Sequence, residues 1–488
     1  MAGSRQGPKR TMMMCRLALR SLLLHPVRSA VLAGGFGLGV SVMASLLGVG
    51  EVILEQARSP ALVGGGDVVV AGWTGKLGSA RFILSSALQA PPLVGRAVGA
   101  SPRVERSLYL VRDDRVVPVR ARGGVPSLER ALDDAETAAV AAWIDTPADA
   151  AWTSPDPGDV LRAMDRFHPI SGPAARAESW AEWLYFNGVA GGTRFSLTFL
   201  VGPPSESGRR MAGVRLQLDR DGDLTSYTDS AEIDEAELLA QAPDLTIGGS
   251  RVRLDGLRYH VTLDLPASDA NADEDGGRRS PPDSRVTGDI VLTANVGQAL
   301  PPMTIRGAGG WLSGYVVPVM AGGLAGVLRV AGDVVSLDGG VGYHDHNWGH
   351  WKGVSWQWGQ VHGDGLSFVY GHLSPPADAA DARRIPGFLA VLGPDGPIGH
   401  SMEVAIEEDD VAQTGAPRRI VVSAQSPSLD LTMEIDVEAA VVTRMDPGLF
   451  GSSLDFYQLH AVFHVAGSVA GRSVDFTAPG SAETFRGR

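Results

Sequence analysis

Residues 194–200 (RFSLTFL) carry the pattern that decides the fold. Their apolar side chains alternate with polar ones, and residues 214–218 (VRLQL) repeat the same period of two before Asp221 and Gly222. Such alternation is typical of a strand with one buried face, and an Asp-Gly pair is typical of a hairpin turn. The stretch therefore predicts antiparallel strands joined by tight turns.

The same character continues to the C-terminus. Short alternating segments are separated by turn signals at 248–249, 255–256, 364–365 and 394–396, and there is little helical periodicity. Regularly spaced short strands predict antiparallel barrels or sandwiches, and the region after residue 150 is long enough for two of them.

Composition excludes several classes of function. The chain of 488 residues has 42 Lys and Arg against 55 Asp and Glu, a net charge of −13, so nothing in the balance favours a nucleic-acid partner. Cys15 is the single cysteine and cannot form an intramolecular disulfide. The sequence shows no nucleophile elbow, phosphate loop or dinucleotide fingerprint, so we expect neither a serine hydrolase nor a nucleotide cofactor, and we predict no cofactor of any kind.

Residues 29–50 predict a transmembrane helix. They form 22 residues without a charge, bounded by Arg28 and Glu51, which matches the roughly 20 residues that cross a bilayer. Basic residues lie before this segment, so the N-terminus is expected in the cytoplasm and everything after Gly50 on the extracytoplasmic, periplasmic side. The alternative is a cleaved signal peptide, although no clean small-residue cleavage site follows the apolar run.

Two further segments flank this span. Residues 1–28 form a basic cytoplasmic segment whose arginines and leucines have the spacing of an amphipathic helix. Residues 51–150 predict a small mixed α/β region, with a strand pair around 107–121 and a helix over 127–142.

The densest candidate site is the run GYHDHNWGHWKGVSWQW at 342–358. It holds four of the ten tryptophans and three of the eleven histidines, which marks either a site or an unusual core. If its start is a strand, alternate residues face opposite ways, with Tyr343, Asp345 and Asn347 on one face and His344, His346 and Trp348 on the other.

Three interpretations of this run stay open. His344 and His346 could bind a metal together with His350 or Asp345, but two histidines do not complete a site, and we predict no metal. Asp345 could serve as an acid if an aromatic cavity raised its pKa. The polar side chains could instead join two barrels by hydrogen bonds, and spacing alone favours this packing role.

A second run, EWLYFNG at 182–188, predicts a strand with aromatic and carboxylate side chains. Trp183, Tyr185 and Asn187 alternate in it with Glu182. A single glutamate beside tryptophan is more often a hydrogen-bond acceptor than a catalyst.

These runs resemble a known family. EWLYFNG at 182–188, GYHDHNWG at 342–349 and SAETFRG at 481–487 are similar to motifs of the carotenoid 1,2-hydratase (hydroxyneurosporene synthase, CrtC) and AttH-like lipocalin superfamily. The resemblance implies a mainly β protein with two tandem lipocalin-like barrels, at 151–340 and 341–488. Residues 17–40 and 64–70 resemble the first membrane helix and following segment of FtsX/MacB-type ABC transporter permeases.

The hydratase members of that family add water to a terminal isoprenoid double bond. The resemblance therefore implies a hydro-lyase acting on a hydrophobic, isoprenoid or lipid-like molecule, with Asp345, or protonated His344 or His346, as the acid. Where the family pattern has an acidic residue two positions after a tyrosine, this chain has Tyr370 and His372. The implied substrate-binding residues are Glu182, Trp183, Tyr185, Tyr343, Asn347, Trp348, Trp356, Trp358 and Tyr370.

A non-catalytic role is the alternative. AttH-like relatives are encoded beside ABC transporters, so the chain could be an accessory subunit that docks on such a transporter through its anchor and holds cargo. Whether the protein is an enzyme stays open at this point.

Overall fold

The computed structural model describes the chain from residue 99 onward, apart from several gaps. The gaps after residue 99 are 113–114, 133–143, 154–155, 171, 173, 206, 268–284, 296, 412–414, 446–453 and 488, and before it only 20, 24, 26–27, 69–70, 80, 83–84 and 96–97 are described. The expected span at 29–50, its permease-like neighbourhood and most of 1–28 lie outside these residues. Within the described part, no helix is long and apolar enough to cross a membrane.

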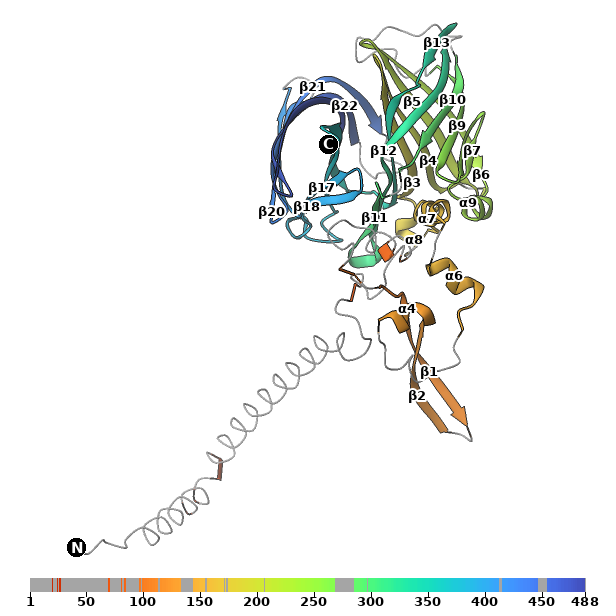
Figure 1. Cartoon of the computed structure of the whole chain (residues 1–488), viewed down its shortest axis with the longest axis vertical. Coiled ribbons are helices and arrows are strands. Elements are labelled where there is room, and N and C mark those ends of the chain that lie inside the picture. Colours follow the sequence, from red (N-terminus) through yellow and green to blue (C-terminus); the bar gives the residue numbers. More distant parts are fainter. Residues whose placement is uncertain are drawn as a thin grey trace, which may run out of the picture. The chain divides into compact units, whose positions relative to one another are not determined.

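The first sheet is antiparallel and curls into a nearly closed barrel (Figure 1). Its order is β6-β5-β4-β3-β14-β12-β10-β9-β8-β7, and β11 and β13 pair with the long β12. The strands are β3 (Trp180–Ala190), β4 (Thr193–Pro204), β5 (Arg210–Arg220), β6 (Asp223–Ile233), β7 (Leu245–Ile247), β8 (Ser250–Asp255), β9 (Arg258–Pro266), β10 (Arg285–Thr293), β11 (Leu300–Arg306), β12 (Leu312–Val330), β13 (Asp333–Ser336) and β14 (Gly340–His350).

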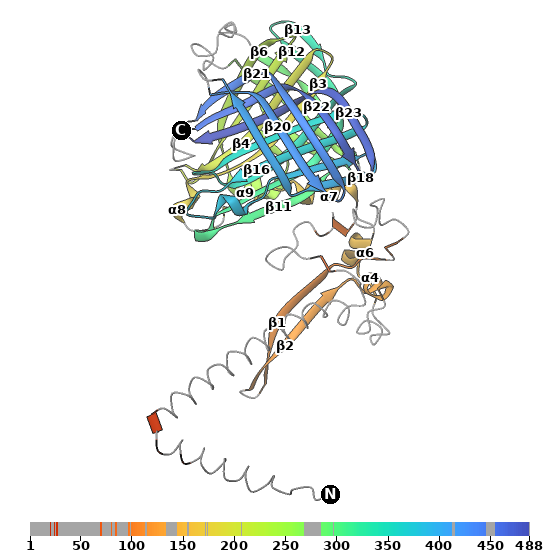
Figure 2. The ribbon, with the colours of Figure 1, turned by 90° about the vertical axis from the view of Figure 1, so that its left-hand side faces the viewer.

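The second sheet forms another nearly closed antiparallel barrel, in the order β18-β17-β16-β15-β23-β22-β21-β20-β19. Figure 2 shows its long strands β20 to β23 side by side. The strands are β15 (Ser355–Gly363), β16 (Leu366–Ser374), β17 (Phe388–Gly393), β18 (Gly396–Ser401), β19 (Glu403–Asp410), β20 (Pro417–Ser426), β21 (Leu429–Met445), β22 (Leu454–Val469) and β23 (Arg472–Gly487). The mainly β fold of two barrels expected from the sequence is confirmed.

The alternating pattern explains why these strands form. Phe195, Leu197 and Phe199 of β4 are buried in the core of the first barrel, and β4 pairs with β5 as the sequence predicts. Asp221 and Gly222 follow with φ of 52° and 92°, the left-handed conformation that a tight hairpin turn requires. Burying each such side chain stabilises the barrel by about 1.5–3 kcal/mol relative to leaving it exposed.

The boundary between the barrels lies later than the sequence suggested. Strand β14 pairs with β3 on one side and β12 on the other, so it belongs to the first sheet. The first barrel therefore extends to His350, and the second begins with β15 at Ser355, instead of changing at 340/341. The physical reason is that the backbone of β14 is hydrogen-bonded on both edges by strands of the first sheet.

Few helices accompany the sheets in the described part. They are α4 (Pro126–Ala131), α6 (Pro147–Thr153), α7 (Pro157–Met164), α8 (Ala174–Ala177), α9 (Glu235–Gln241) and two short 3-10 turns, Ala308–Gly310 and Ala382–Arg384. The predicted strand pair near 107–121 is present as β1 (Arg103–Arg112) and β2 (Arg115–Gly124). Of the helix expected at 127–142, α4 is described and residues 133–142 are not.

Helix α7 matters most for the site, because it covers one end of the first barrel (Figure 1). Asp156 caps its N-terminus and Pro157 begins its first turn, a combination that favours helix initiation. Leu161 packs into the barrel core, and Asp165 ends the helix as its C-cap. The chain thereby carries Asp165 and the residues after it to the barrel interior.

Candidate functional site

Two neighbouring strands carry most of the predicted site. β3 and β14 are antiparallel, and their register places Tyr185 opposite Asp345 and Trp183 opposite Asn347. Alternate residues of β14 make contacts on opposite sides of the sheet, as the period of two predicts. One side faces α7 and the interior of the first barrel, and the other faces the second barrel.

On the interior side, a chain of buried polar groups connects β14 to α7. Asp165 contacts two histidines, with Oδ2 2.9 Å from Nε2 of His344 and Oδ1 2.8 Å from Nδ1 of His346. The hydroxyl of Tyr259 donates to Asp165 Oδ2 at 2.9 Å. His346 Nε2 lies 2.9 Å from Glu182 Oε1, which lies 2.7 Å from His168 Nδ1.

Charges in this chain shift each other's pKa. Burial by itself would raise the pKa of Asp165, but the charges and hydrogen bonds of His344 and His346 outweigh burial and hold it well below its usual range. Burial would lower the pKa of His346, yet hydrogen bonds to Asp165 and Glu182 raise it to about 9. For Glu182, the hydrogen bonds from His168 and His346 outweigh burial and lower the pKa.

On the opposite side, the side chains form rows across β4, β3, β14 and β12. One row is Leu200, Trp183, Asn347 and Tyr315, and the next contains Thr198, Tyr185 and Asp345. Adjacent strands lie about 4.8 Å apart, so residues within a row are nearest neighbours on this face. This face packs against Trp356 and Trp358 of β15, in a cluster of aromatic and aliphatic residues shared by both barrels.

Asp345 begins a chain of hydroxyl groups on this side. Its Oδ2 lies 2.9 Å from the hydroxyl of Tyr343, which lies 2.7 Å from the hydroxyl of Tyr315. The indole N–H of Trp358 donates to Tyr315 at 3.0 Å, and the side-chain amide of Asn347 donates to Asp345 Oδ1 at 2.8 Å. All five side chains are buried.

The chain ends near a half-buried aromatic rim. The ring of Tyr315 lies 6.2 Å from that of Trp356 and 5.8 Å from that of Phe388, and both of these rings are partly exposed. Trp183 also lies on the rim, 6.5 Å from Trp356. The hydroxyls therefore connect a buried carboxyl to partly exposed aromatic rings.

A second buried carboxyl, Glu483 of β23, lies on the same side. Burial raises the pKa of Glu483 to about 8. Burial, reinforced by the charge of Glu483, raises the pKa of Asp345 well above its usual range, and the hydrogen bonds of Tyr343 and Asn347 only partly offset this. Two buried carboxyl groups whose pKa values are raised thus face one aromatic cluster.

Several buried polar atoms at this interface have no hydrogen-bond partner among the described residues. They are Oδ1 of Asn347, Oε1 of Gln360 and Oε1 of Glu483. Gln360 donates its amide to Asn187 of the first barrel at 3.0 Å, so its free oxygen lies where the barrels meet. Polar atoms of this kind are costly to bury unpaired, which favours a polar ligand group or water beside them.

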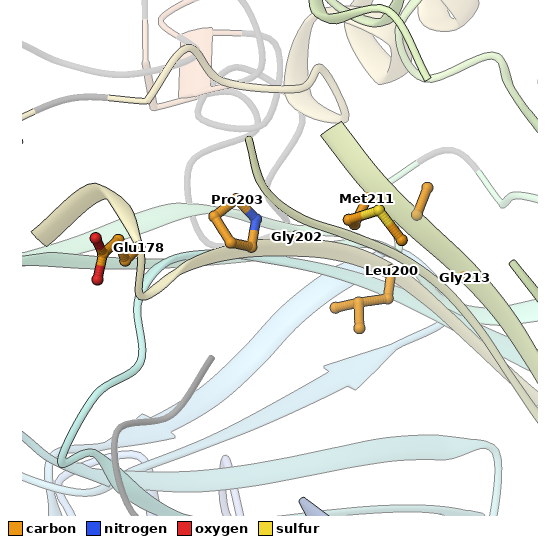
Figure 3. A pocket seen from close by; sticks show the side chains of 7 residues that line it. Glu178, Leu200, Gly202, Pro203, Met211 and Gly213 are labelled. Carbon is orange, nitrogen blue, oxygen red and sulfur yellow. The ribbon is translucent and has the colours of Figure 1, made fainter. Parts of the chain in front are cut away.

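An open depression adjoins the aromatic rim. It has a volume of about 390 Å³ and a largely apolar lining of Leu200, Pro203, Met211 and neighbouring glycines, with Glu178 at one edge (Figure 3). Leu200 stands opposite Trp183 in the β3–β4 register.

The structure separates the predicted site residues into three groups. Glu182, His344, His346 and Trp348 lie on the interior side, and Trp183, Tyr185, Tyr343, Asp345, Asn347, Trp356 and Trp358 lie on the side of the second barrel. Tyr370 and His372 belong to neither group.

Tyr370 and His372 lie away from the other predicted residues because of the pleat of β16. Tyr370 is opposite Gly359, and its ring is buried in the core of the second barrel. His372 is half-buried, and its Nε2 lies 3.3 Å from the carbonyl oxygen of Ile385. Neither side chain has a hydrogen bond to Asp345 among those described.

Sequence reasoning did not single out several members of the two clusters. These are Asp165, His168, Asn187, Tyr259, Tyr315, Gln360 and Glu483. The Asp-Pro pair at the start of α7 is a sequence signal for a helix, and Asp165 lies at the end of that helix. Glu483 lies inside the quoted run 481–487. Asn187 likewise lies inside the quoted run 182–188. The remaining residues carry no local signal, because only the fold brings them together.

Comparison with known proteins returns structural similarity alone. No protein-family profile and no curated protein matches the sequence. An AttH protein from Nitrosomonas europaea is similar at 15% identity and a TM-score of 0.41, covering 65% of this chain and 98% of that one. CghA in complex with Sch210972 is similar at 10% identity and a TM-score of 0.42, covering 66% of this chain and 94% of that one. Kievitone hydratase from Nectria haematococca is similar at 14% identity and a TM-score of 0.40, covering 66% of this chain and 97% of that one.

Proposed function

We propose that the two-barrel region binds an apolar, unsaturated molecule of isoprenoid or lipid-like character and adds water to one of its double bonds. The observation that carries this proposal is the hydroxyl chain from buried Asp345 through Tyr343 to Tyr315, which ends beneath the rim of Trp356 and Phe388. Protonating an alkene needs a positioned acid, and aromatic faces stabilise the cation that forms.

The proposed reaction is an acid-promoted hydration. The carboxyl proton of Asp345 passes to Tyr343, the proton of Tyr343 passes to Tyr315, and the proton of Tyr315 adds to one carbon of the double bond. The resulting carbocation lies against Trp356 and Phe388 until a water oxygen attacks it. The proton lost by that water returns through the same hydroxyls to Asp345, so one water is added and the acid is regenerated.

The apolar remainder of the substrate would occupy the depression beside Leu200. Its lining offers mostly carbon atoms, so binding there is driven by burial of apolar surface. The buried amide and carboxyl groups near Asn347 and Gln360 would bind the water that attacks the cation. Their unpaired oxygens can accept hydrogen bonds from it.

A matched pair of variants tests the acid. The Asp345→Asn variant keeps the shape of the side chain but removes its acidic proton. The control, Asp475→Asn, changes an exposed carboxyl of β23. The full chain is incubated with squalene or an acyclic carotenoid in ¹⁸O-labelled water, and products are analysed by mass spectrometry. We expect labelled alcohol from the wild type and the control, and a rate about 10²- to 10⁴-fold lower from Asp345→Asn.

Extraction of the purified full chain with solvent separates catalysis from binding. A lipophile present in both the wild type and Asp345→Asn, without turnover of any isoprenoid by either, would refute hydration and support a cargo-binding accessory subunit of an ABC transporter. Equal turnover by the two proteins would instead remove Asp345 from the reaction.

We also propose that residues 29–50 anchor the chain, with the barrels on the extracytoplasmic side. The proposal rests on the uncharged run and the basic residues before it. Removal of residues 1–50 should release the protein from the membrane fraction. Digestion of the barrels by protease added to intact spheroplasts would support the orientation, and their protection would refute it.

A further inference from the structure

The interior side of β3 and β14 holds a group of side chains that the proposed hydration does not use. Glu182 and His346 are buried, and His168 is 26% exposed. One nitrogen of each histidine and the carboxylate of Glu182 lie within 4.8 Å of one another. We infer that His168 Nδ1, Glu182 and His346 Nε2 form a binding site for a divalent transition metal ion, with Zn²⁺ as the best fit.

The donor set favours zinc. Two imidazole nitrogens and one carboxylate oxygen match the ligands that Zn²⁺ takes in proteins, whereas Ca²⁺ and Mg²⁺ prefer oxygen alone. Three protein ligands leave one tetrahedral position, and the partial exposure of His168 gives water access to it. Three ligands with an open position are the arrangement of catalytic zinc sites rather than structural ones.

The groups behind the ligands also fit a metal site. Metal-binding histidines usually hold their second nitrogen against a carboxylate, which fixes the ring and its tautomer. His346 does so through Nδ1, 2.8 Å from Asp165. Asp165 is held in turn by the hydroxyl of Tyr259, and Glu182 accepts the backbone N–H of His168 at 3.0 Å.

His168 is positioned although it lies in a loop. Its ring stacks on the indole of Trp348, with centroids 4.2 Å apart and planes 15° from parallel. Trp348 itself lies close over Gly314 of β12, where any side chain would overlap the indole. The stacking gives the most exposed ligand a defined direction towards Glu182.

Only a small movement separates the present geometry from coordination. The histidine nitrogens lie 2.7 and 2.9 Å from Glu182 Oε1, while ligands of a tetrahedral ion with bonds of about 2.1 Å lie about 3.4 Å apart. Each nitrogen must therefore move roughly 0.5–0.7 Å away from the carboxylate oxygen. His168 has the most freedom to do so because it is the least enclosed of the three.

Cobalt provides the direct test, since Co²⁺ in a four-coordinate site absorbs visible light far more strongly than hydrated Co²⁺. The full chain is treated with a chelator, dialysed and titrated with Co²⁺ alone, and then with Zn²⁺. We expect one equivalent of the intense spectrum, lost when Zn²⁺ displaces Co²⁺, and a rise in Tm with Zn²⁺.

Three variants make the test specific. The His168→Ala variant should weaken metal binding by at least about 100-fold, because loss of an outer partner alone costs about 10–100-fold. Tyr259→Phe, which keeps every ligand, should weaken it by about 10-fold. His464→Ala removes an exposed histidine of β22 and should bind like the wild type.

Two outcomes would overturn the inference. One is a spectrum no stronger than that of hydrated Co²⁺ in the wild type, because the cluster would then be held by protons. The other is equal affinity in the wild type and His168→Ala, which would place the metal elsewhere. Neither outcome depends on hydration activity, so this site and the acid site fail or succeed separately.

Discussion

The pH dependence of stability should reveal the protonated Glu483. Its folded pKa of about 8 lies above the ordinary value of 4.5, so between these pH values the folded state keeps a proton that the unfolded state has released. Stability then falls as pH rises, by about 1.4 kcal/mol per pH unit for one proton. From pH 5 to pH 8 the loss is on the order of 4 kcal/mol.

The Glu483→Gln variant removes this titration while keeping the size of the side chain. The free energy of unfolding is measured by urea denaturation at pH 5, 6, 7 and 8 for both proteins. We expect the difference between their free energies of unfolding to change steadily with pH, because the wild type loses stability relative to the variant as pH rises. Other titrating groups are common to both proteins and largely cancel in the difference.

Glu407→Gln serves as the matched control, because Glu407 is exposed on β19 of the same barrel. Its difference from the wild type should stay nearly constant over the same pH range. Parallel stability profiles for the wild type and Glu483→Gln would show that Glu483 is ionised in the folded protein. The aromatic cluster would then face a carboxylate and not a protonated carboxyl.

Three further variants test the surrounding geometry. Gly314→Ala introduces a methyl group that overlaps Trp348, so we expect a loss of about 1–3 kcal/mol of stability by urea denaturation, whereas no loss would mean the indole is not packed there. Tyr315→Phe breaks the hydroxyl chain, so we expect the hydration rate in the ¹⁸O assay to fall at least tenfold while ligand affinity is unchanged. An unchanged rate would contradict the relay. His372→Ala should leave that rate within about twofold, since its ring has no hydrogen bond to the acid, and a large loss would contradict the placement of the site.

The sequence predicted the fold and the division of the site into two faces. Alternation over 194–200 and 342–348 gave the strands and showed that Asp345 and His346 face opposite ways, because a period of two requires no knowledge of partners. It could not supply the partners themselves. His344 meets Asp165 across 179 positions of sequence, and only strand pairing and the placement of α7 produce that contact.

The same limit explains why Tyr370 and His372 lie apart from the other candidate residues. Their strand pairs with that of Trp358. The register, however, sets Gly371 opposite Trp358, so the tyrosine on one side of Gly371 turns into the second barrel's core. A shift of one residue changes the face of every side chain on a strand, and motif spacing alone does not determine register.

β14 presents two kinds of chemistry on its two faces, and their separation has a measurable consequence. Asp345 and His346 are adjacent in sequence, yet Asp345 bonds to Tyr343 and Asn347 while His346 bonds to Asp165 and Glu182. A pleated strand keeps such neighbours from sharing partners, so their variants should act independently. Asp345→Asn should lower the hydration rate about 10²- to 10⁴-fold without altering the Co²⁺ spectrum. His168→Ala should weaken Co²⁺ binding by at least about 100-fold while the hydrating face keeps its own hydrogen bonds. If Asp345→Asn changed the metal spectrum as strongly as His168→Ala, the two faces would be one coupled site, and the assignment of acid and metal chemistry to separate sides of β14 would have to be given up.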